Sequence, residues 1–221
     1  MLKNMLAEKL NLRSAEGTLR NLQYENTLYD FSSNDYLGFA RSEELKKTIS
    51  EELEKHPLTP LGATGSRLLS GNTEFAEELE KEIAVIHKAA NGLIFNSGYT
   101  ANLALFSCVP QKNDTIICDE LIHASVIDGA RLSLAKRLKF KHNDLEDLEK
   151  KIRLSTGQCY VAVESVYSMD GDLADLIHIA MLCRDLNAHL IVDEAHALGV
   201  LGTGLVDLLH LHHSVFARVV T

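Results

Sequence analysis

The feature that most constrains the fold is the alternation of short apolar runs with helix-patterned segments from residue 92 onwards. Runs rich in apolar and β-branched residues predict strands, and the segments between them space their apolar side chains as helices do. This alternation is typical of βαβ units, in which helices pack on a mostly parallel sheet. Strands are expected at 92–96, 115–118, 137–141, 160–165, 189–193 and 218–221. Helices are expected at 99–107, 125–136, 144–153 and 173–187.

Three further helices are expected earlier in the chain. In residues 43–55 apolar side chains recur every four positions, which predicts a helix with one buried stripe that prolines then end. Asn72 or Thr73 is expected to cap a second helix, because glutamates that favour the positive end of the helix dipole fill its first turns. Residues 1–9 interrupt their apolar positions with charges, which predicts an amphipathic helix rather than a signal peptide or a membrane span.

Charge and cysteine content narrow the classes of function. The 221 residues carry a formal net charge of −9 and contain no basic block, so neither nucleic acid nor an anionic membrane surface is an expected partner. The four cysteines are far apart and form no C-x-x-C pair, which argues against a zinc site or a disulfide framework. A reducing, cytoplasmic location is therefore expected.

The strand at 189–193 ends abruptly in charged residues. Its apolar run is followed by Asp193 and Glu194, and His196 lies three residues beyond Asp193. In an open α/β sheet, ligands bind just outside the carboxyl ends of the strands. We therefore expect Asp193 and His196 to face a ligand at that edge.

Polar residues follow three other predicted strands. Gly98 and Tyr99 open a helix directly after a strand, where free backbone amides and the helix dipole can bind a phosphate. His123 precedes another helix, where its ring can lie over an aromatic ligand, and Ser168 follows a fourth strand. A phosphate site at one end and a buried acid at the other predict a flat heterocycle between them, with Asp193 keeping its ring nitrogen protonated.

Other interpretations of these motifs remain open at this level. The glycine-rich stretch 61–72 has the composition of a phosphate loop but lacks the G-K-[S/T] ending. Asp-Glu-Ala-His at 193–196 also names a class of helicase ATPases, which would require such a loop upstream. The histidines His210, His212 and His213 suggest a metal site, but no cysteine or carboxylate set completes the coordination, so no metal is expected.

Taken together, the motifs resemble those of a known family. From residue 18 to residue 221 the chain is similar to the α-oxoamine synthases, which are relatives of the fold type I aminotransferases that depend on pyridoxal 5'-phosphate (PLP). The resemblance rests on Ser-Ser-Asn-Asp-Tyr-Leu-Gly (32–38), Gly-Ser-Arg-Leu-Leu-Ser-Gly-Asn (65–72), Asn-Ser-Gly-Tyr (96–99), His-Ala-Ser (123–125), Ser-Met-Asp-Gly-Asp (168–172) and Asp-Glu-Ala-His (193–196), in family order. It implies an α/β fold of three αβα layers, with an N-terminal segment at 1–45 and a PLP-binding large domain at 46–221.

The resemblance also implies which residues hold the cofactor. Gly98 and Tyr99 would bind it near its phosphate, and Thr221 would reach the same phosphate. His123 would stack on the ring, and Asp193 would pair with the pyridine nitrogen.

Three more residues receive roles from the resemblance. Ser168 and His196 would act at the ring hydroxyl, so the catalytic set would be His123, Asp193 and His196. Arg20 would match the family's substrate-binding arginine, and His123 would also face the substrate.

The glycine-rich motif separates branches of the family. The 5-aminolevulinate synthases typically carry threonine where this chain has Ser66, and the 2-amino-3-ketobutyrate coenzyme A ligases usually carry Cys-Gly-Thr in this region. The resemblance therefore implies condensation of L-alanine with a pimeloyl thioester of coenzyme A or acyl carrier protein, which gives 8-amino-7-oxononanoate for biotin synthesis. A binding-only role for the chain is the main alternative, and an ATPase of the Asp-Glu-Ala-His class is a remote one.

The family's Schiff-base lysine is the expected feature that this sequence lacks. In the family it follows the strand after Asp-Glu-Ala-His, whereas this chain ends in Arg218-Val219-Val220-Thr221 and its last lysine is Lys151. We expect the chain to be a fragment without the small C-terminal domain, unable to turn over alanine. The full-length protein is expected to be a homodimer in which the segment 65–72 reaches the neighbour's cofactor.

Overall fold

The structure is a computed structural model that describes residues 2–20, 22, 29–57, 60 and 62–221. It divides into an N-terminal unit, Met1–Asn34, and a large unit, Asp35–Thr221. The N-terminal unit holds helix α1 (Leu2–Ala15), which confirms the helix predicted at residues 1–9 and extends beyond it, but its apolar side chains do not gather on one face, so the predicted amphipathic character is wrong. The helix ends before Gly17, whose φ of 67° suits the left-handed residue that often follows a helix.

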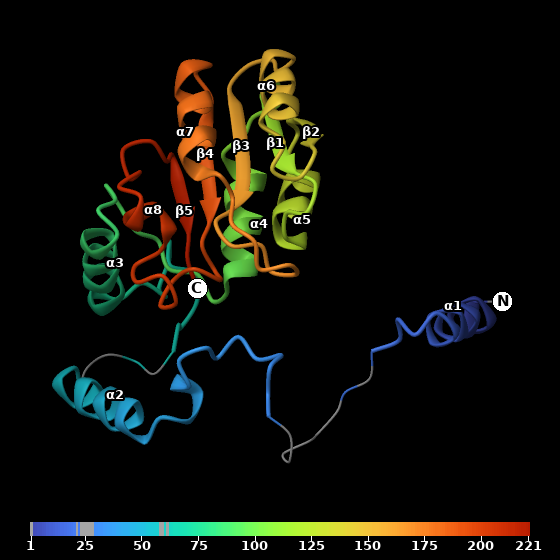
Figure 1. The fold of residues 1–221 in the computed structure, drawn as a ribbon. Coiled ribbons are helices and arrows are strands. Elements are labelled where there is room, and N and C mark those ends of the chain that lie inside the picture. The colour runs from blue at the N-terminus through green and yellow to red at the C-terminus, as the bar shows by residue number, and fades with distance from the viewer. Residues whose placement is uncertain (1, 21, 23–28, 58–59, 61) are drawn as a thin grey trace. The chain divides into compact units, whose positions relative to one another are not determined.

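Five parallel strands form the sheet of the large unit (Figure 1). They are β1 (Thr115–Asp119), β2 (Lys136–Phe140), β3 (Cys159–Glu164), β4 (His189–Asp193) and β5 (Ala217–Val219), in the order β2-β1-β3-β4-β5. The order of the strands reverses at β1 and β3, because β2 lies on one side of β1 and all later strands lie on the other. Such a reversal opens a crevice at the carboxyl ends of the two strands, where α/β proteins bind their ligands.

Helices cover both faces of this sheet. They are α4 (Gly98–Cys108) and α5 (Ala124–Leu132) on one face, and α6 (Leu145–Arg153), α7 (Leu176–Asp185) and the short α8 (Leu205–Leu208) on the other. Successive strand residues point to opposite faces, so Ile116 packs with Phe106 of α4 whereas Ile117 packs with Leu148 of α6. Burial on both faces explains the apolar runs of β1, β3 and β4, and the two helix layers confirm the predicted three-layer αβα fold.

Two helices that precede the sheet each begin at a side-chain cap, and the cap of the second, Thr73, is one of the two residues predicted. A 3-10 turn, η1 (Phe39–Arg41), leads into α2 (Glu43–Lys55), whose N-cap Ser42 accepts a hydrogen bond from the Leu45 N–H. Thr73 caps α3 (Glu74–Ile86) by accepting from the Ala76 N–H. Each cap satisfies a backbone donor that the helix itself leaves free. None of the helices in the described part of the chain combines the length and the apolar composition that a bilayer crossing requires.

The strand predicted at 92–96 is wrong. This segment is irregular, and its Ile94 N–H donates to the Glu80 carboxylate at 2.8 Å instead of to a neighbouring strand. Leu93 is exposed, so its apolar character does not reflect burial in the sheet. An apolar run forms a strand only where another strand lies beside it to accept its backbone hydrogen bonds.

Two predicted helices are shorter than expected. Helix α5 ends at Leu132 because Ser133 is extended, with its hydroxyl donating to the Pro110 carbonyl at 3.1 Å. Helix α7 begins only at Leu176, since Asp175 caps it by accepting from the His178 N–H. Polar residues inside the periodic pattern therefore set both ends.

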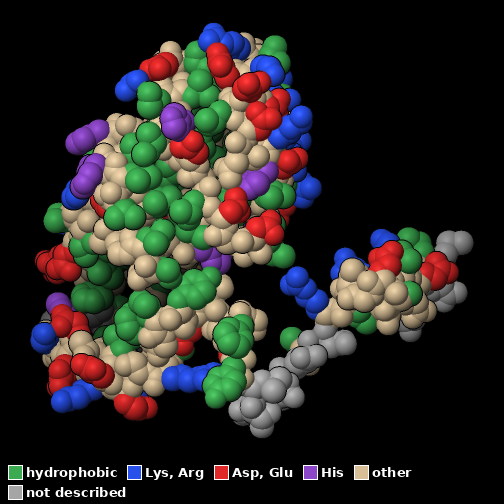
Figure 2. Space-filling view, viewed as in Figure 1, with side chains coloured by type: hydrophobic (Ala, Val, Ile, Leu, Met, Phe, Trp, Pro, Cys, Tyr) green, Lys and Arg blue, Asp and Glu red, His purple; other side chains and the backbone are tan. Residues whose placement is uncertain are grey.

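Apolar side chains are spread over the visible face of the structure among isolated charges (Figure 2). The exposed apolar residues of the large unit include Leu68 and Leu69, which are 95% and 88% exposed in the glycine-rich segment. Five more exposed apolar side chains of the large unit belong to Leu121, Leu132, Leu134, Met169 and Leu173. Monomeric proteins expose single apolar side chains routinely, but two adjacent, nearly fully exposed leucines on one loop favour contact with another surface.

Candidate active site

The candidate site is centred on Asp193, the last residue of β4. The apolar residues before it place the strand in the core, and the Asp193 side chain is only 7% exposed where the strand ends. Its Oδ1 accepts the Ala195 N–H at 3.0 Å, and its Oδ2 accepts Asn102 Nδ2 at 2.6 Å. Each carboxyl oxygen of Asp193 therefore accepts one hydrogen bond from within the chain.

A chain of hydrogen bonds connects Asp193 to His123. Asn102, which is buried on α4, also donates to the hydroxyl of buried Ser125 at 3.0 Å. The Ser125 hydroxyl lies 2.8 Å from Nδ1 of His123, and the Ser125 N–H donates to the same nitrogen at 3.2 Å, so His123 caps α5. The network ties together the ends of α4, α5 and β4, although Asn102 and Asp193 are 91 residues apart.

The start of α4 brings four of the predicted site residues together. The Tyr99 ring meets the His123 ring edge-on, with centroids 6.1 Å apart, and its hydroxyl donates to Asp128. This hydrogen bond raises the pKa of Tyr99 above its ordinary value. A Cβ on Gly98 would lie 2.1 Å from Cγ2 of Thr221, so glycine lets the end of the chain lie against the first turn of α4.

Glu164 is a second buried acid at this edge. It ends β3 in direct register with Asp193 on β4, and it is fully enclosed. Burial, reinforced by the negative charge of Asp193, raises the pKa of Glu164 to about 7. Its Oε2 accepts the Ser168 N–H at 3.3 Å, the His123 backbone N–H also favours its charged form, and its Oε1 has no hydrogen-bond partner within the described residues.

His196 lies in the turn after β4, away from the network around Asp193. Its Nδ1 is 2.7 Å from the hydroxyl of Tyr36, which precedes η1. Leu37, which follows Tyr36, packs its side chain against Gly199. A Cβ added to Gly199 would lie 3.0 Å from Cδ1 of Leu37. The turn around Tyr36 thus contacts the loop that follows β4.

Ser168 and Arg20 complete the set of predicted residues. Ser168 is exposed, and its backbone N–H, rather than its side chain, contacts the site through Glu164. Arg20 belongs to the N-terminal unit and is exposed there. The large unit holds the other seven.

A polar cluster anchors the loop that carries Ser168. His142, just after β2, contacts Asp119 at 3.0 Å through Nδ1 and Asp172 at 2.7 Å through Nε2. Burial lowers the pKa of His142, but the two carboxylates outweigh it and raise the pKa above its ordinary value. The loop is thereby fixed to the carboxyl ends of β1 and β2.

Sequence reasoning did not assign roles to Asn102, Ser125, Glu164 or Tyr36. Asn102 could have been found as a polar residue four positions before Phe106, on the core face of the helix. Glu164 shows the same signal as Asp193, an acid that ends an apolar strand. Ser125 and Tyr36 lie within quoted motifs, but no local pattern indicates what their hydroxyls contact.

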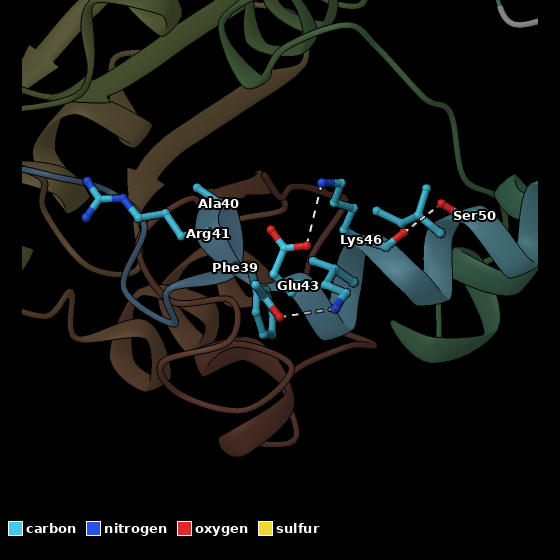
Figure 3. Close-up of a pocket in the computed structure, with 9 residues that line it drawn as sticks. Phe39, Ala40, Arg41, Glu43, Lys46 and Ser50 are labelled. Atoms are coloured by element: carbon cyan, nitrogen blue, oxygen red, sulfur yellow. Dashed lines mark hydrogen bonds and ion pairs between the residues drawn. The ribbon is translucent and has the colours of Figure 1, made fainter.

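A cavity near α2 and the histidines at 210–213 lie outside the candidate site. A cavity of about 410 Å³ lies between η1 and the first turns of α2, where Glu43 and Lys46 form an ion pair at 3.5 Å (Figure 3). It contains none of the predicted site residues. Across the described part of the chain, no group of three or more histidine, cysteine or acidic side chains is arranged to hold a metal ion. The histidines at 210–213 therefore do not form such a group.

Comparison with known proteins identifies the family. Residues 26–217 match the family model described as aminotransferase class I and II. The chain belongs to this family. Over its whole length it is 42% identical to 8-amino-7-oxononanoate synthase of Emericella nidulans, of which it covers 58%.

The chain is also similar to a second curated protein and to a solved structure. A serine palmitoyltransferase of Bacteroides thetaiotaomicron is 40% identical over 84% of this chain and 48% of that protein. A high-resolution structure of SPT with its PLP internal aldimine superposes with a TM-score of 0.74 at 30% identity, covering 83% of this chain and 46% of that one. The chain spans about half the length of the curated relatives it matches.

The Gly129→Ala substitution should destabilise the contact between α5 and α4, the helix that carries Asn102. Gly129 lies where α5 crosses α4, and an added Cβ would be 2.9 Å from Cβ of Phe106 and 3.0 Å from the Asn102 carbonyl oxygen. Overpacking of this kind costs about 1–3 kcal/mol, so we expect urea unfolding to show a loss of that size. Gly62→Ala, at a position with open space around it, is the matched control. Equal stability of the two variants would contradict the close helix crossing.

Proposed function

We propose that this chain is the cofactor-binding part of a PLP-dependent acyltransferase that condenses L-alanine with a pimeloyl thioester. The products would be 8-amino-7-oxononanoate, carbon dioxide and the free thiol carrier, as in biotin biosynthesis. The observation that carries the proposal is the buried Asp193 carboxylate, which two donors hold at the carboxyl edge of the sheet. The 42% identity to an 8-amino-7-oxononanoate synthase supports the choice of substrates. In this proposal residues 1–45 form an N-terminal segment and residues 46–221 the large domain.

The residues at this edge fit PLP. A buried carboxylate suits a protonated pyridine nitrogen, with which it forms a strong charge-assisted hydrogen bond. The first turn of α4, with Gly98 at its start, suits a phosphate because its backbone amides are free to donate. Asn102 Oδ1 is buried without a hydrogen-bond partner among the described residues, which leaves an acceptor for a bound group.

Each residue then has a defined task. Bound PLP supplies an electron sink for charge that develops at the α-carbon of the amino acid. Asp193 holds the pyridine nitrogen in its protonated form, and His123 lies over the ring. His196, whose ring is fixed by Tyr36, acts with Ser168 at the ring hydroxyl.

The ends of the site are assigned in the same way. Gly98, Tyr99 and Thr221 bind the phosphate, and Arg20 binds the carboxylate of the substrate. Leu68 and Leu69 stand out from a loop that Arg67 anchors to Glu80, and we place them at the interface of a homodimer. The second subunit would then complete each site.

The 221 residues contain no lysine beyond Lys151, and we infer that this chain alone forms no Schiff base at the site. The chain itself can be treated with PLP and borohydride, followed by peptide mapping. We expect no stoichiometric adduct on any single lysine and no product from alanine. One fully labelled lysine together with product formation would contradict the inference.

The substrates can be tested with a full-length protein that contains this chain. We expect mass spectrometry to detect 8-amino-7-oxononanoate with L-alanine and pimeloyl-coenzyme A or pimeloyl-acyl carrier protein. Serine with a palmitoyl thioester is the second candidate pair, since a serine palmitoyltransferase is 40% identical to the chain. Preference for that pair would replace the pimeloyl assignment, and glycine with acetyl or succinyl thioesters tests the other branches. ATP hydrolysis without any effect of PLP would overturn the whole proposal.

A further inference from the structure

We propose that Asn102 is a positioning residue that decides which of the two adjacent buried acids, Asp193 or Glu164, carries the negative charge. Its partner Ser125 passes the same constraint on to His123. The proposal concerns contacts within this chain, and its link to catalysis rests on the proposed function.

The two acids compete for one proton. Asp193 and Glu164 are paired in register on adjacent strands, and both are buried, so ionising both would place two like charges side by side in a medium of low dielectric. Asp119, which is fully buried at the end of β1, adds a third acid nearby and further disfavours charge on Glu164. The hydrogen bonds around the pair must therefore determine where the charge resides.

The donors around the pair are unequal. Asp193 receives Asn102 Nδ2 at 2.6 Å and the Ala195 N–H at 3.0 Å, one on each oxygen. Glu164 receives only backbone donors, the Ser168 N–H at 3.3 Å and the His123 N–H, and its Oε1 has no hydrogen-bond partner within the described residues. An amide NH₂ can only donate, so Asn102 stabilises the carboxylate of Asp193 and leaves the proton to Glu164.

The orientation of Asn102 is fixed by the same contacts. Turning the amide over would bring Oδ1 against the Asp193 carboxylate, which has no hydrogen to donate in its charged form. In the observed orientation both Nδ2 hydrogens are used, one on Asp193 and one on the Ser125 hydroxyl at 3.0 Å. Ser125 has then accepted a hydrogen and can give its own to His123 Nδ1 at 2.8 Å.

The order of donors also fixes the tautomer of His123. The Ser125 N–H can only donate, so Nδ1 must be the acceptor and the ring proton lies on Nε2. The backbone N–H of Ser125 thus sets the tautomer of His123, and the side chains of Ser125 and Asn102 connect that ring to the Asp193 carboxyl group.

The experiment uses the chain without cofactor, so that its result does not depend on the proposed function. Carboxyl ¹³C shifts of Asp193 and Glu164 are followed from pH 5 to pH 8 in the parent and in Asn102→Leu. In the parent, Glu164 should titrate near pH 7. In the variant we expect Asp193 to take up part of the proton, so both carboxyls change together over this range. Superimposable curves in parent and variant would overturn the proposal.

Ser125→Ala gives a second test if the leucine variant does not fold. The variant keeps the backbone N–H that donates to Nδ1, so His123 should stay in the Nε2–H tautomer, but loss of the hydroxyl donor should move the ¹⁵N shift of Nδ1. An unchanged Nδ1 shift would count against the hydrogen-bond chain. Asn113→Leu, at an exposed asparagine, is the matched control for both readouts. PLP binding is measured separately: failure to bind, with the expected titrations, would reject the proposed function but retain the assignment of Asn102.

Discussion

Replacing Arg218 with methionine is expected to lower the free energy of unfolding by about 3–5 kcal/mol, because it would remove the arginine that pairs with buried Glu194 and would leave buried Asp207 with Lys88, at 3.7 Å, as its cationic partner. Arg218, on β5, is 9% exposed on its side chain and pairs with Glu194 and, at 3.0 Å, with Asp207. It also donates to the Thr203 carbonyl at 2.8 Å. Glu194 is completely buried directly after Asp193, so the loss falls beside the candidate site.

The surroundings of this ion pair allow little relaxation. Gly204 has a φ of 111°, and a Cβ there would lie 2.7 Å from the Glu194 carboxylate. The Glu194 N–H donates to the Val219 carbonyl at 2.8 Å, which joins the end of β4 to β5. Burial tends to raise the pKa of Asp207, but the hydrogen bond and charge of Arg218 hold it below its ordinary value. Arg218 is therefore the residue that contacts both buried acids and favours the charged form of Asp207.

Urea unfolding at pH 7 measures the effect of Arg218→Met. Arg184→Met is the control, since Arg184 is an exposed residue that pairs with its neighbour Asp185, and such pairs contribute about 0–1 kcal/mol. Adding Glu194→Gln and Asp207→Asn to Arg218→Met should recover part of the loss, because amides carry no charge. A loss no larger than that of Arg184→Met would mean that water reaches the two acids.

Local sequence patterns were sufficient for the elements whose ends carry a chemical signal. The strand at 189–193 and the helix at 43–55 have the predicted bounds, because an acid ends the one and Ser42 caps the other. The apolar run at 92–96 has the same local signal but lacks a strand beside it. Whether a partner exists depends on residues far away in sequence, so local periodicity could not distinguish the two cases.

The same limit applies to the candidate site. Asp193 and His123 could be selected as polar residues at the ends of apolar strands. The contact between them could not, since it passes through Asn102 on a helix 91 residues before Asp193. The strand order that places Glu164 beside Asp193 is likewise a property of the assembled sheet. Residue types were therefore readable from the sequence, whereas the pairing that sets their charge was not.

Replacing Glu164 with glutamine is expected to change how stability depends on pH. Burial, with the charge of Asp193, raises the pKa of Glu164 to about 7, above the value of 4.5 that is ordinary for a glutamate. The folded protein therefore binds more protons than the unfolded chain between these two values, and its stability falls as pH rises through that range. Below about pH 4.5 this loss is absent, and above about pH 7 it is complete. Glutamine cannot ionise, so Glu164→Gln should abolish the loss.

The measurement is urea unfolding of the parent and Glu164→Gln at pH 5, 6, 7 and 8. Because one pKa unit corresponds to about 1.4 kcal/mol, the stability of the variant relative to the parent should rise by about 2–3 kcal/mol from pH 5 to pH 8. Glu78→Gln, at an exposed position of α3, controls for the loss of one carboxylate from the chain. Adding Asp193→Asn to the parent should reduce the pH-dependent loss, because it removes the charge that opposes ionisation of Glu164. A difference between Glu164→Gln and the parent that stays constant from pH 5 to pH 8 would show that Glu164 is not a proton-holding acid in the folded protein.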